Sequence, residues 1–268
     1  MSFFKKLFEK KECDFCGGEI GLLGNRKLED GNMCKHCAAK LSPWFSDRRN
    51  STVAEIGEQL KYREENKEKV AAFNTTRTLG ENTKVLLDED AGVFMVTSSR
   101  DLEEDNPDVL AFSDVTGCEL DIDESDQELK RTDSEGKLVS YNPPRYKYYY
   151  SFYVVIHVRN PYFDEIRFRL NGASVEIEPP PAPAGRGGRM INGLLGSRFS
   201  PENDVDYRRY KEMGEEIKEA LLQIRQQARD EKAAAEAPKT AVTCPYCGAT
   251  TTPDASGCCE YCGGAVDA

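Results

Sequence analysis

Pairs of cysteines are the residues in this sequence whose spacing most directly indicates chemistry. The chain has ten cysteines in 268 residues, and eight of them form four Cys-x-x-Cys pairs. Cys13 with Cys16 and Cys34 with Cys37 stand seventeen residues apart, a separation typical of a four-cysteine zinc site. Tetrahedral Zn²⁺ takes four thiolates at about 2.3 Å, and a Cys-x-x-Cys turn brings two sulfurs to one ion. These four residues are therefore predicted to bind zinc.

Two other interpretations apply to the same pairs. Cysteines at this spacing also occur in disulfides and in thioredoxin-like redox motifs, but no β-α-β pattern surrounds these residues. His36 lies between Cys34 and Cys37. Since four thiolates complete the coordination shell, we interpret His36 as an exposed bystander rather than a ligand.

The second group of cysteines lies near the C-terminus, with eleven residues between its two pairs. Both pairs read Cys-x-Tyr-Cys-Gly, which is typical of a zinc ribbon built from two hairpins. The predicted ligands are Cys244, Cys247, Cys259 and Cys262. Cys258 is interpreted as a spare thiol or as an alternative donor to Cys259. The predicted cofactor is two Zn²⁺ ions, one per site, with iron as the alternative because four thiolates suit both metals.

The sequence carries no recognisable catalytic motif. It lacks a Gly-x-x-x-x-Gly-Lys-Ser/Thr loop, a Gly-x-Ser-x-Gly elbow and a His-Glu-x-x-His helix, and it has only two histidines. A complete four-sulfur shell leaves no open coordination position for hydrolysis. Cys118 stands alone and is interpreted as a small buried apolar residue. His157, with no evident acidic partner in its own strand, is interpreted as non-catalytic. We therefore predict that the protein is not an enzyme.

The elements that position the cysteines follow from local patterns. Residues 1–50 have a small apolar set around Ile20, Leu22 and Leu28, so this treble-clef or knuckle-like zinc module is expected to need its metal to fold. Thr52 and Glu55 form a capping-box signature that begins a connecting helix over residues 51–74. The stretch 61–69, KYREENKEK, is interpreted as a solvated helical spacer.

From residue 75 the pattern changes to short runs of β-branched and aromatic residues, which predict strands. In the strongest run, residues 146–158, alternate side chains from Tyr146 to Val158 share one face that is expected to be core. A helix from about Asp204 to Ala235 carries one apolar stripe. The predicted fold class is α+β, with an antiparallel β-barrel or sandwich over 75–232 capped by this long helix. A linker at 233–242 leads to the zinc ribbon at 243–268.

Two parts of the chain resemble known folds or families. The order of strands followed by one long helix resembles the pleckstrin-homology-like (PH-like) fold. The segment CDFCGGEIGLLGNRKLEDGNMCKHCAAKLSPWFSDRRN and the helix after it resemble a bacterial family of unknown function with a four-cysteine N-terminus, over roughly residues 1–80. That resemblance implies an intracellular bacterial protein with zinc ligands at Cys13, Cys16, Cys34 and Cys37, and it implies no established activity.

Charge is unevenly distributed along the chain, whose formal net charge is -11. Residues 101–140 hold fourteen acidic and three basic residues, and the run at 123–126 is interpreted as a solvated, mobile loop rather than a calcium site. This balance excludes a generic binder of polyanions. Residues 1–49 hold ten basic and seven acidic residues, and Arg186, Arg189 and Arg198 add a second local basic patch.

The first eleven residues, MSFFKKLFEKK, form a short amphipathic pattern with aromatic residues on one side and lysines on the other. We expect this segment to dock on its own domain or in a partner's groove more readily than to hold a membrane, because so short a helix is marginal alone. The chain has no apolar run long enough to span a bilayer and no secretory signal pattern, so a cytoplasmic location is expected.

The function predicted from these observations is that of a non-enzymatic, zinc-binding cytosolic adaptor whose partners are proteins. One alternative is a nucleic-acid or ribosome-associated protein that binds through its zinc ribbons and the basic segment 1–49. Another is a peripheral membrane protein that makes weak contact through residues 1–11 and the PH-like domain.

Overall fold

The computed structural model describes residues 11–21, 23–180, 200–236, 241–252 and 257–266. The chain divides into two compact units, Met1–Arg225 and Gln226–Ala268. The predicted amphipathic helix at residues 1–11, apart from Lys11, lies outside the described residues. In the described part of the chain, no helix combines the length and the apolar character that crossing a bilayer requires.

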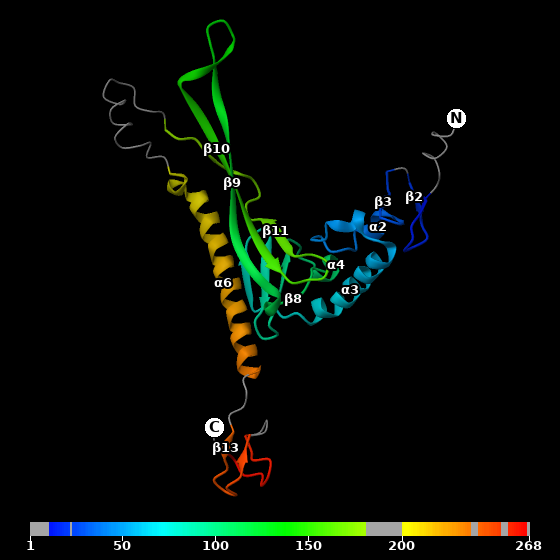
Figure 1. Ribbon diagram of the computed structural model, residues 1–268. Helices are drawn as coiled ribbons and strands as arrows, with labels where there is room; N and C mark the ends of the chain where they lie inside the picture. The colour runs from blue at the N-terminus through cyan, green and yellow to red at the C-terminus, as the bar shows by residue number, and fades with distance from the viewer. Residues whose placement is uncertain (1–10, 22, 181–199, 237–240, 253–256, 267–268) are drawn as a thin grey trace. The chain divides into compact units, whose positions relative to one another are not determined.

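Short strands and helical turns build the N-terminal module (Figure 1). Its elements are β1 (Lys11–Glu12), β2 (Glu19–Ile20), β3 (Arg26–Lys27), β4 (Asn32–Met33), α2 (Lys35–Ala38) and η1 (Asp47–Asn50). β1 pairs antiparallel with β2, and β3 pairs antiparallel with β4. Leu28, Met33 and Ile56 are fully buried in the small core beneath these elements. A core with so few apolar side chains is typical of small domains that are stabilised by disulfides or a metal ion.

Helix α3 (Val53–Ala72) begins at the predicted capping box. The hydroxyl oxygen of Thr52 accepts the backbone N–H of Glu55 at 3.3 Å, and the Glu55 carboxylate accepts the Thr52 N–H at 2.8 Å. Hydrogen bonds from Thr52 lower the pKa of Glu55, the backbone bond contributing most. The helix ends at Phe73, whose backbone turns to an extended conformation.

The prediction that residues 61–69 form a solvated spacer is wrong. One face of α3 is buried along its whole length, with residues spaced three or four apart as a helical stripe requires. The buried residues are Ile56, Gln59, Arg63, Asn66 and Val70. Two of its polar residues, Arg63 and Asn66, are accommodated there because their side chains form hydrogen bonds with backbone groups of the segment 106–109.

The first sheet of the middle region is antiparallel and has the strand order β5-β6-β7-β8. Its strands are β5 (Arg77–Gly80), β6 (Lys84–Asp88), β7 (Val93–Thr97) and β8 (Leu110–Ala111). The short helices α4 (Leu102–Asp105) and η2 (Phe112–Asp114) flank β8. Val85, Leu87, Phe94 and Met95 are fully buried, as the β-branched and aromatic runs in this region predict.

The second sheet is centred on one long strand. It contains β9 (Val115–Thr132), β10 (Leu138–Val158), β11 (Glu165–Arg169) and β12 (Val175–Ile177). β10 pairs with β9 along one edge and with β11 and β12 along the other, all antiparallel. Tyr150, Phe152, Val154 and Ile156 are buried, which confirms the predicted core face for the inner half of β10, but Val155 on the opposite face is buried as well.

Beyond Tyr150 the β9–β10 hairpin projects from the core, as Figure 1 shows. Every residue of β10 from Leu138 to Tyr149 is exposed or half-buried. The acidic run 123–126, predicted as a mobile loop, instead lies within β9, where Ser125 pairs with Tyr149 and Glu124 with Tyr150. The prediction failed because a strand with solvent on both faces tolerates charged side chains when its partner strand is rich in tyrosine.

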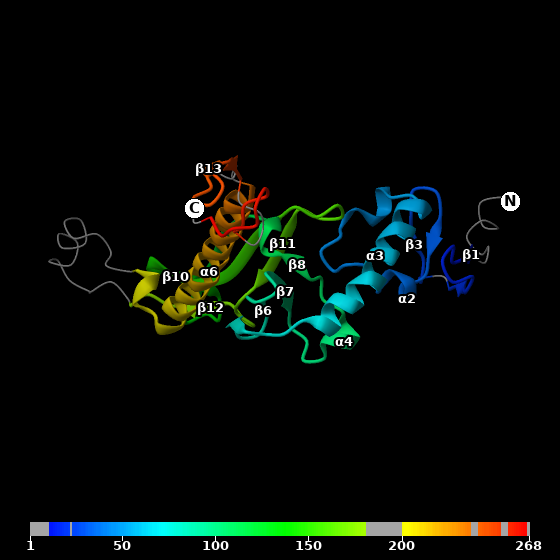
Figure 2. The same ribbon diagram turned by 90° about the horizontal axis from the view of Figure 1, so that it is seen from below.

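Helix α6 (Val205–Glu236) packs on the second sheet (Figure 2). The Tyr207 ring meets the rings of Tyr150 and Phe152 edge-on, at centroid distances of 4.9 and 5.1 Å. Ile217 and Leu221 continue the buried stripe. The short helix η3 (Pro201–Asn203) precedes α6.

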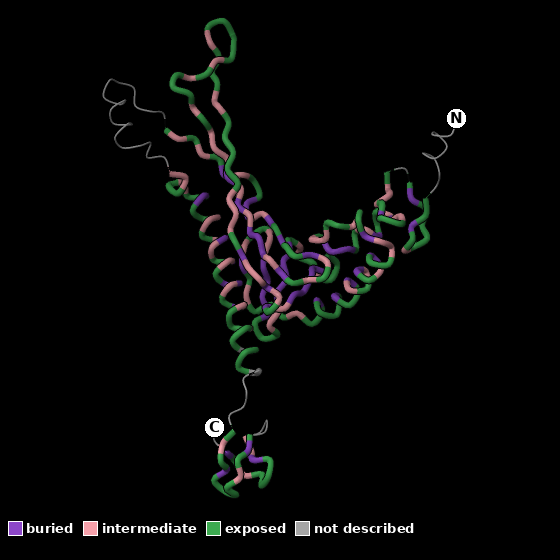
Figure 3. The backbone as a smooth tube through the Cα atoms, viewed as in Figure 1, coloured by how far each residue is buried: buried purple, intermediate pink, exposed green. Residues whose placement is uncertain are grey.

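The middle region is not a closed barrel, which corrects that part of the predicted fold class. Among the described residues, no hydrogen-bonded ladder joins the first sheet to the second. The chain passes from the first sheet to the second through η2, a helical turn that separates β8 from β9. What the structure shows is an α+β arrangement of antiparallel sheets with a long helix on one of them, and the buried residues concentrate in these elements (Figure 3).

The second unit contains the end of α6 and the C-terminal cysteine module. Its strands are β13 (Val242–Thr243) and β14 (Thr250–Thr251), which pair antiparallel. Cys244, Cys259 and Val266 form its small buried cluster, with Val242 packed against them.

Candidate metal centres

The N-terminal cysteines converge on one point. The sulfurs of Cys13, Cys16, Cys34 and Cys37 all lie within 4.8 Å of one another. Cys13 follows β1, and Cys16 lies in the turn after it. Cys34 caps the N-terminus of α2, and Cys37 lies inside that helix. Two elements of different type, a tight turn and the start of a helix, therefore bring the four thiols together.

The C-terminal cysteines converge in the same way. The sulfurs of Cys244, Cys247, Cys259 and Cys262 also lie within 4.8 Å of one another. Cys258 is outside this group and forms an isolated β-bridge with Ala265. The structure thus places Cys259, and not Cys258, among the clustered thiols.

The same backbone turn occurs at three of the four Cys-x-x-Cys pairs. After Cys13, the N–H of Gly17 donates to the Cys13 carbonyl at 2.8 Å, and the N–H of Cys13 donates to Gly18 O at 2.9 Å. The turns that begin at Cys244 and Cys259 repeat this pair of bonds. In each turn the fifth residue is a glycine with positive φ, between 65° and 72°. A side chain at that position would be strained, which explains the glycine in each motif.

Backbone N–H groups point at several of the sulfurs. The N–H of Cys34 donates to Cys13 Sγ and that of Cys37 to Cys34 Sγ, each at 3.3 Å. Burial raises the pKa of Cys13, but backbone N–H groups, first that of Cys34, outweigh it and lower the pKa to about 6. Burial and the surrounding thiols raise the pKa of Cys37. One thiol therefore ionises easily, whereas its neighbour resists carrying a second negative charge.

The C-terminal cluster shows the same division. Burial raises the pKa of Cys259, but backbone N–H groups, first that of Tyr261, lower it to about 7. The backbone N–H of Gly264 lowers the pKa of Cys262, but the neighbouring thiols of Cys247 and Cys244 raise it to about 12. Four thiolates this close repel one another, and a divalent metal ion would compensate their negative charge.

The distances between sulfurs test whether the clusters fit such an ion. Cys16 Sγ lies 3.8 Å from Cys34 Sγ, and in the other cluster the Cys244–Cys262 and Cys247–Cys259 distances are 3.6 and 3.8 Å. A tetrahedron with metal–sulfur bonds of about 2.3 Å has edges of about 3.8 Å, whereas a disulfide bond is about 2.05 Å. Both clusters are thus consistent with one tetrahedral metal ion each, and zinc suits the donor set.

The remaining candidate residues are not members of the clusters. Cys118 is buried, and burial raises its pKa to about 12, so it is a weak nucleophile. His36 is exposed on α2. His157 does have an acidic neighbour, because its Nε2 lies 3.2 Å from a carboxylate oxygen of Glu119 on β9. The search for a partner within one strand missed this contact, since Glu119 is brought close by the pairing of β9 with β10.

A buried polar network connects the N-terminal module to the middle region, and sequence reasoning missed it. Arg63 Nη1 donates to Asp108 Oδ1 at 2.8 Å, and Arg63 Nε donates to the carbonyl of Lys40 at 3.2 Å. The Ser42 hydroxyl donates to Asp108 Oδ2 at 2.7 Å. The side chains of Arg63 and Asp108 are only 6% and 1% exposed. The signal that could have found it was the spacing of the polar residues between Ile56 and Val70 on the buried stripe of α3.

Residues 11–59 match a protein family described as "Domain of unknown function (DUF4428)". The match contains the N-terminal cluster and ends within α3, so it is shorter than the resemblance over residues 1–80 suggested. No curated protein and no solved structure matches the chain.

Proposed function

We propose that this chain is a non-enzymatic interaction protein in which two zinc ions stabilise small recognition modules. The observation that carries the proposal is that each cluster brings four sulfurs within 4.8 Å of one another, which is the number of donors that a tetrahedral zinc ion takes. A zinc ion held by four thiolates contributes folding energy and leaves no coordination position for a substrate or an activated water. Zinc in this proposal is structural.

The C-terminal module is the proposed contact surface for a partner protein. Tyr246 and Tyr261, one inside each Cys-x-Tyr-Cys turn, are both 73% exposed. Tyrosine is enriched at protein interfaces because its ring buries a large area while its hydroxyl stays hydrogen-bonded. A metal-held turn fixes the backbone beneath each ring, so little conformational entropy is lost when the tyrosines bind.

The middle region is proposed to be a divergent PH-like domain. The support is the order of its elements, in which two antiparallel sheets are followed by one long helix that packs on the second sheet. In this proposal the domain is a scaffold that joins the N-terminal module to the C-terminal module through α6.

Site-specific photocrosslinking of the full-length protein in cells tests this function. A photoreactive phenylalanine analogue would replace Tyr246 or Tyr261, and the matched control would carry it at Tyr146, an exposed tyrosine of β10 that is 39% exposed. We expect discrete protein adducts from positions 246 and 261 that disappear when the C-terminal cysteines are changed to serine. Equal labelling at all three positions, or adducts only with RNA, would contradict the proposal.

Metal measurement tests the structural role separately. We expect about two zinc equivalents in reduced full-length protein, and about one after Cys244 and Cys259 are changed to serine. The nucleic-acid and membrane alternatives stay predictions. Residues 1–10, which carry most of the amphipathic segment of the membrane alternative, and the arginines at 186, 189 and 198 lie outside the described residues.

A further inference from the structure

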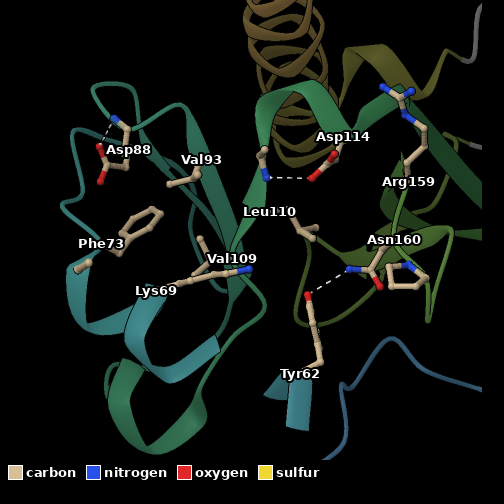
Figure 4. A pocket seen from close by; sticks show the side chains of 14 residues that line it. Tyr62, Lys69, Phe73, Asp88, Val93, Val109, Leu110, Asp114, Arg159 and Asn160 are labelled. Carbon is tan, nitrogen blue, oxygen red and sulfur yellow. Dashed lines mark hydrogen bonds between the residues drawn. The ribbon is translucent and has the colours of Figure 1, made fainter. Parts of the chain in front are cut away.

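A pocket of about 510 Å³ lies where the second half of α3 faces the first sheet and the segment after β10 (Figure 4). Its volume is within the range of pockets that hold small molecules. None of its lining residues is a cysteine.

One wall of the pocket is apolar. It is formed by Phe73 at the end of α3, by Val93 on β7, and by Val109 and Leu110 at the start of β8. Val109 also belongs to a small buried cluster with Val70, against which Phe73 and Val93 pack. This wall is therefore anchored to the core and offers a fixed surface to the apolar part of a ligand.

The polar side of the pocket contains a hydroxyl that is set to donate. Asn160 Nδ2 donates to the Tyr62 hydroxyl oxygen at 3.1 Å, which leaves the Tyr62 proton for another acceptor. Burial and the nearby Asp108 raise the pKa of Tyr62, so the hydroxyl keeps its proton at neutral pH. Figure 4 shows Tyr62 and Lys69 entering the pocket region from α3.

Lys69 supplies a positive charge beside this hydroxyl. Its ammonium lies 5.6 Å from the centroid of the Tyr62 ring. Among the described residues, no carboxylate lies within 4.0 Å of the Lys69 ammonium, whereas Lys67, two residues earlier, is paired with Glu64 at 2.7 Å. The positive charge of Lys69 is thus available to a ligand.

The two carboxylates that line the pocket are already engaged by backbone groups. Asp88 accepts N–H bonds from Asn74 and Ala91 at 2.8 and 3.0 Å, and these bonds lower its pKa. Asp114 accepts the N–H of Ala111 at 3.2 Å (Figure 4). Part of their acceptor capacity is thus used by turns of the protein.

We propose that this pocket binds a small amphiphilic carboxylate, with its apolar body against Val93, Val109 and Leu110 and its carboxylate between Lys69 and the Tyr62 hydroxyl. The Lys69 ammonium would form a charge-assisted hydrogen bond with the anion, and the Tyr62 hydroxyl adds a directional donor. The apolar wall accounts for a body of several methylene groups.

Titration calorimetry of the full-length, zinc-loaded protein with octanoate tests this inference. Octylammonium and 1-octanol have the same chain with the opposite charge and with none, so they separate charge recognition from apolar burial. We expect saturable binding of octanoate, weaker binding of octanol and none of octylammonium. Methyl resonances of Val93 and Val109 should shift with octanoate, which locates the ligand.

Two variants and one control decide whether the named groups act. Lys69→Met should weaken octanoate binding by about tenfold or more, the effect of losing a charge-assisted hydrogen bond. Tyr62→Phe should weaken it less, because the ammonium remains. Lys67→Met, which removes an equal charge from the same helix, should leave binding unchanged. The inference is overturned if Lys69→Met binds octanoate as wild type does, if octylammonium binds equally well, or if octanoate does not bind.

Discussion

Replacing Arg63 with Met is the most informative perturbation of this molecule. Met keeps much of the length of the arginine side chain but removes every hydrogen-bond donor. In the protein, Arg63 bonds to Asp108 and to the carbonyls of Lys40 and Asn106. The variant leaves Asp108, 2% exposed, with Ser42 as its remaining side-chain partner. In the variant, the Asp108 carboxylate is therefore buried without a positively charged partner.

The expected cost follows from this geometry. Removing one partner of a buried ion pair costs about 3–5 kcal/mol, because the remaining charge is both desolvated and unpaired. Since a folded domain is stable by about 5–15 kcal/mol, the loss is a large fraction of the total. Ser42→Ala removes one hydrogen bond to the same carboxylate and should cost about 1.5–3 kcal/mol. Lys61→Met, at an exposed pair with Glu65, should change stability by less than about 0.5 kcal/mol.

The effect of Arg63→Met should also depend on pH. Burial already raises the pKa of Asp108, and Arg63 is the main influence that lowers it. Without Arg63 the folded-state pKa rises further above the unfolded value of about 3.9, so Asp108 is more readily neutralised in the folded state. A carboxyl group whose pKa is higher in the folded state than in the unfolded state favours folding at low pH, and this contribution is lost as pH rises. The destabilisation should therefore be larger at pH 8 than at pH 5.

Urea unfolding followed by tryptophan fluorescence measures these effects near the network itself. Trp44 is the single tryptophan of the chain, and its backbone N–H donates to the Ser42 hydroxyl at 3.2 Å. A double-mutant cycle with Asp108→Leu should show a coupling with Arg63→Met of about 2 kcal/mol, since the double variant leaves no buried charge. A loss below about 1 kcal/mol for Arg63→Met, or a cycle without coupling, would refute the reasoning.

Three further substitutions test packing, polar burial and acid stability. Gly57→Ala in α3 should stabilise the protein by about 0.5–1 kcal/mol, because the added methyl group has no atom within 4 Å. Gly214→Ala in α6 should destabilise it by about 1 kcal/mol, because the added methyl group would clash with the side chain of Leu120. Urea midpoints that move equally for both variants would contradict this. Gln59 is fully buried and its amide has no protein hydrogen-bond partner among the described residues, so Gln59→Met should raise the unfolding free energy by about 1 kcal/mol. Backbone hydrogen bonds lower the pKa of Asp88, so its contribution to stability is present above the unfolded pKa of about 3.9 and is lost as pH falls through the lower folded value. The unfolding free energy of Asp88→Asn should therefore fall less steeply with pH below about pH 4 than that of the wild type. An unchanged pH dependence would contradict this role of Asp88.

The two cysteine clusters were predictable because their geometry is set mostly by short-range spacing. In a Cys-x-x-Cys-Gly turn the two sulfurs are three residues apart, and the glycine permits the positive φ that closes the turn. Only the joining of one pair to another depends on longer-range structure. The pair of Cys34 and Cys37 lacks this glycine turn, and its two sulfurs are close because Cys34 caps the helix that carries Cys37.

The fold of the middle region was predictable to the level of its elements and not of their connections. The alternation along β10 and the stripe of α6 record which faces are buried. They do not predict that β8 is only two residues long and is followed by a helical turn. These two features leave the two sheets, in the described part of the chain, without a hydrogen-bonded connection. The acidic half of β9 carries no apolar alternation at all, because no core lies against it, so its strand character depends on pairing with β10.

The residues of the Arg63 network are polar, so the apolar periodicity of the sequence did not predict that this face of α3 is buried. The network also has a role in the fold. The N-terminal end of the helix packs into the core beside the first cysteine cluster through Ile56, and its C-terminal end packs against the first sheet through Val70. Apolar contacts at two ends set no unique rotation or register for a helix, because such packing is non-directional. The hydrogen bonds from Arg63 and Asn66 to the segment 106–109 are directional, and they hold the helix in one register between its two cores.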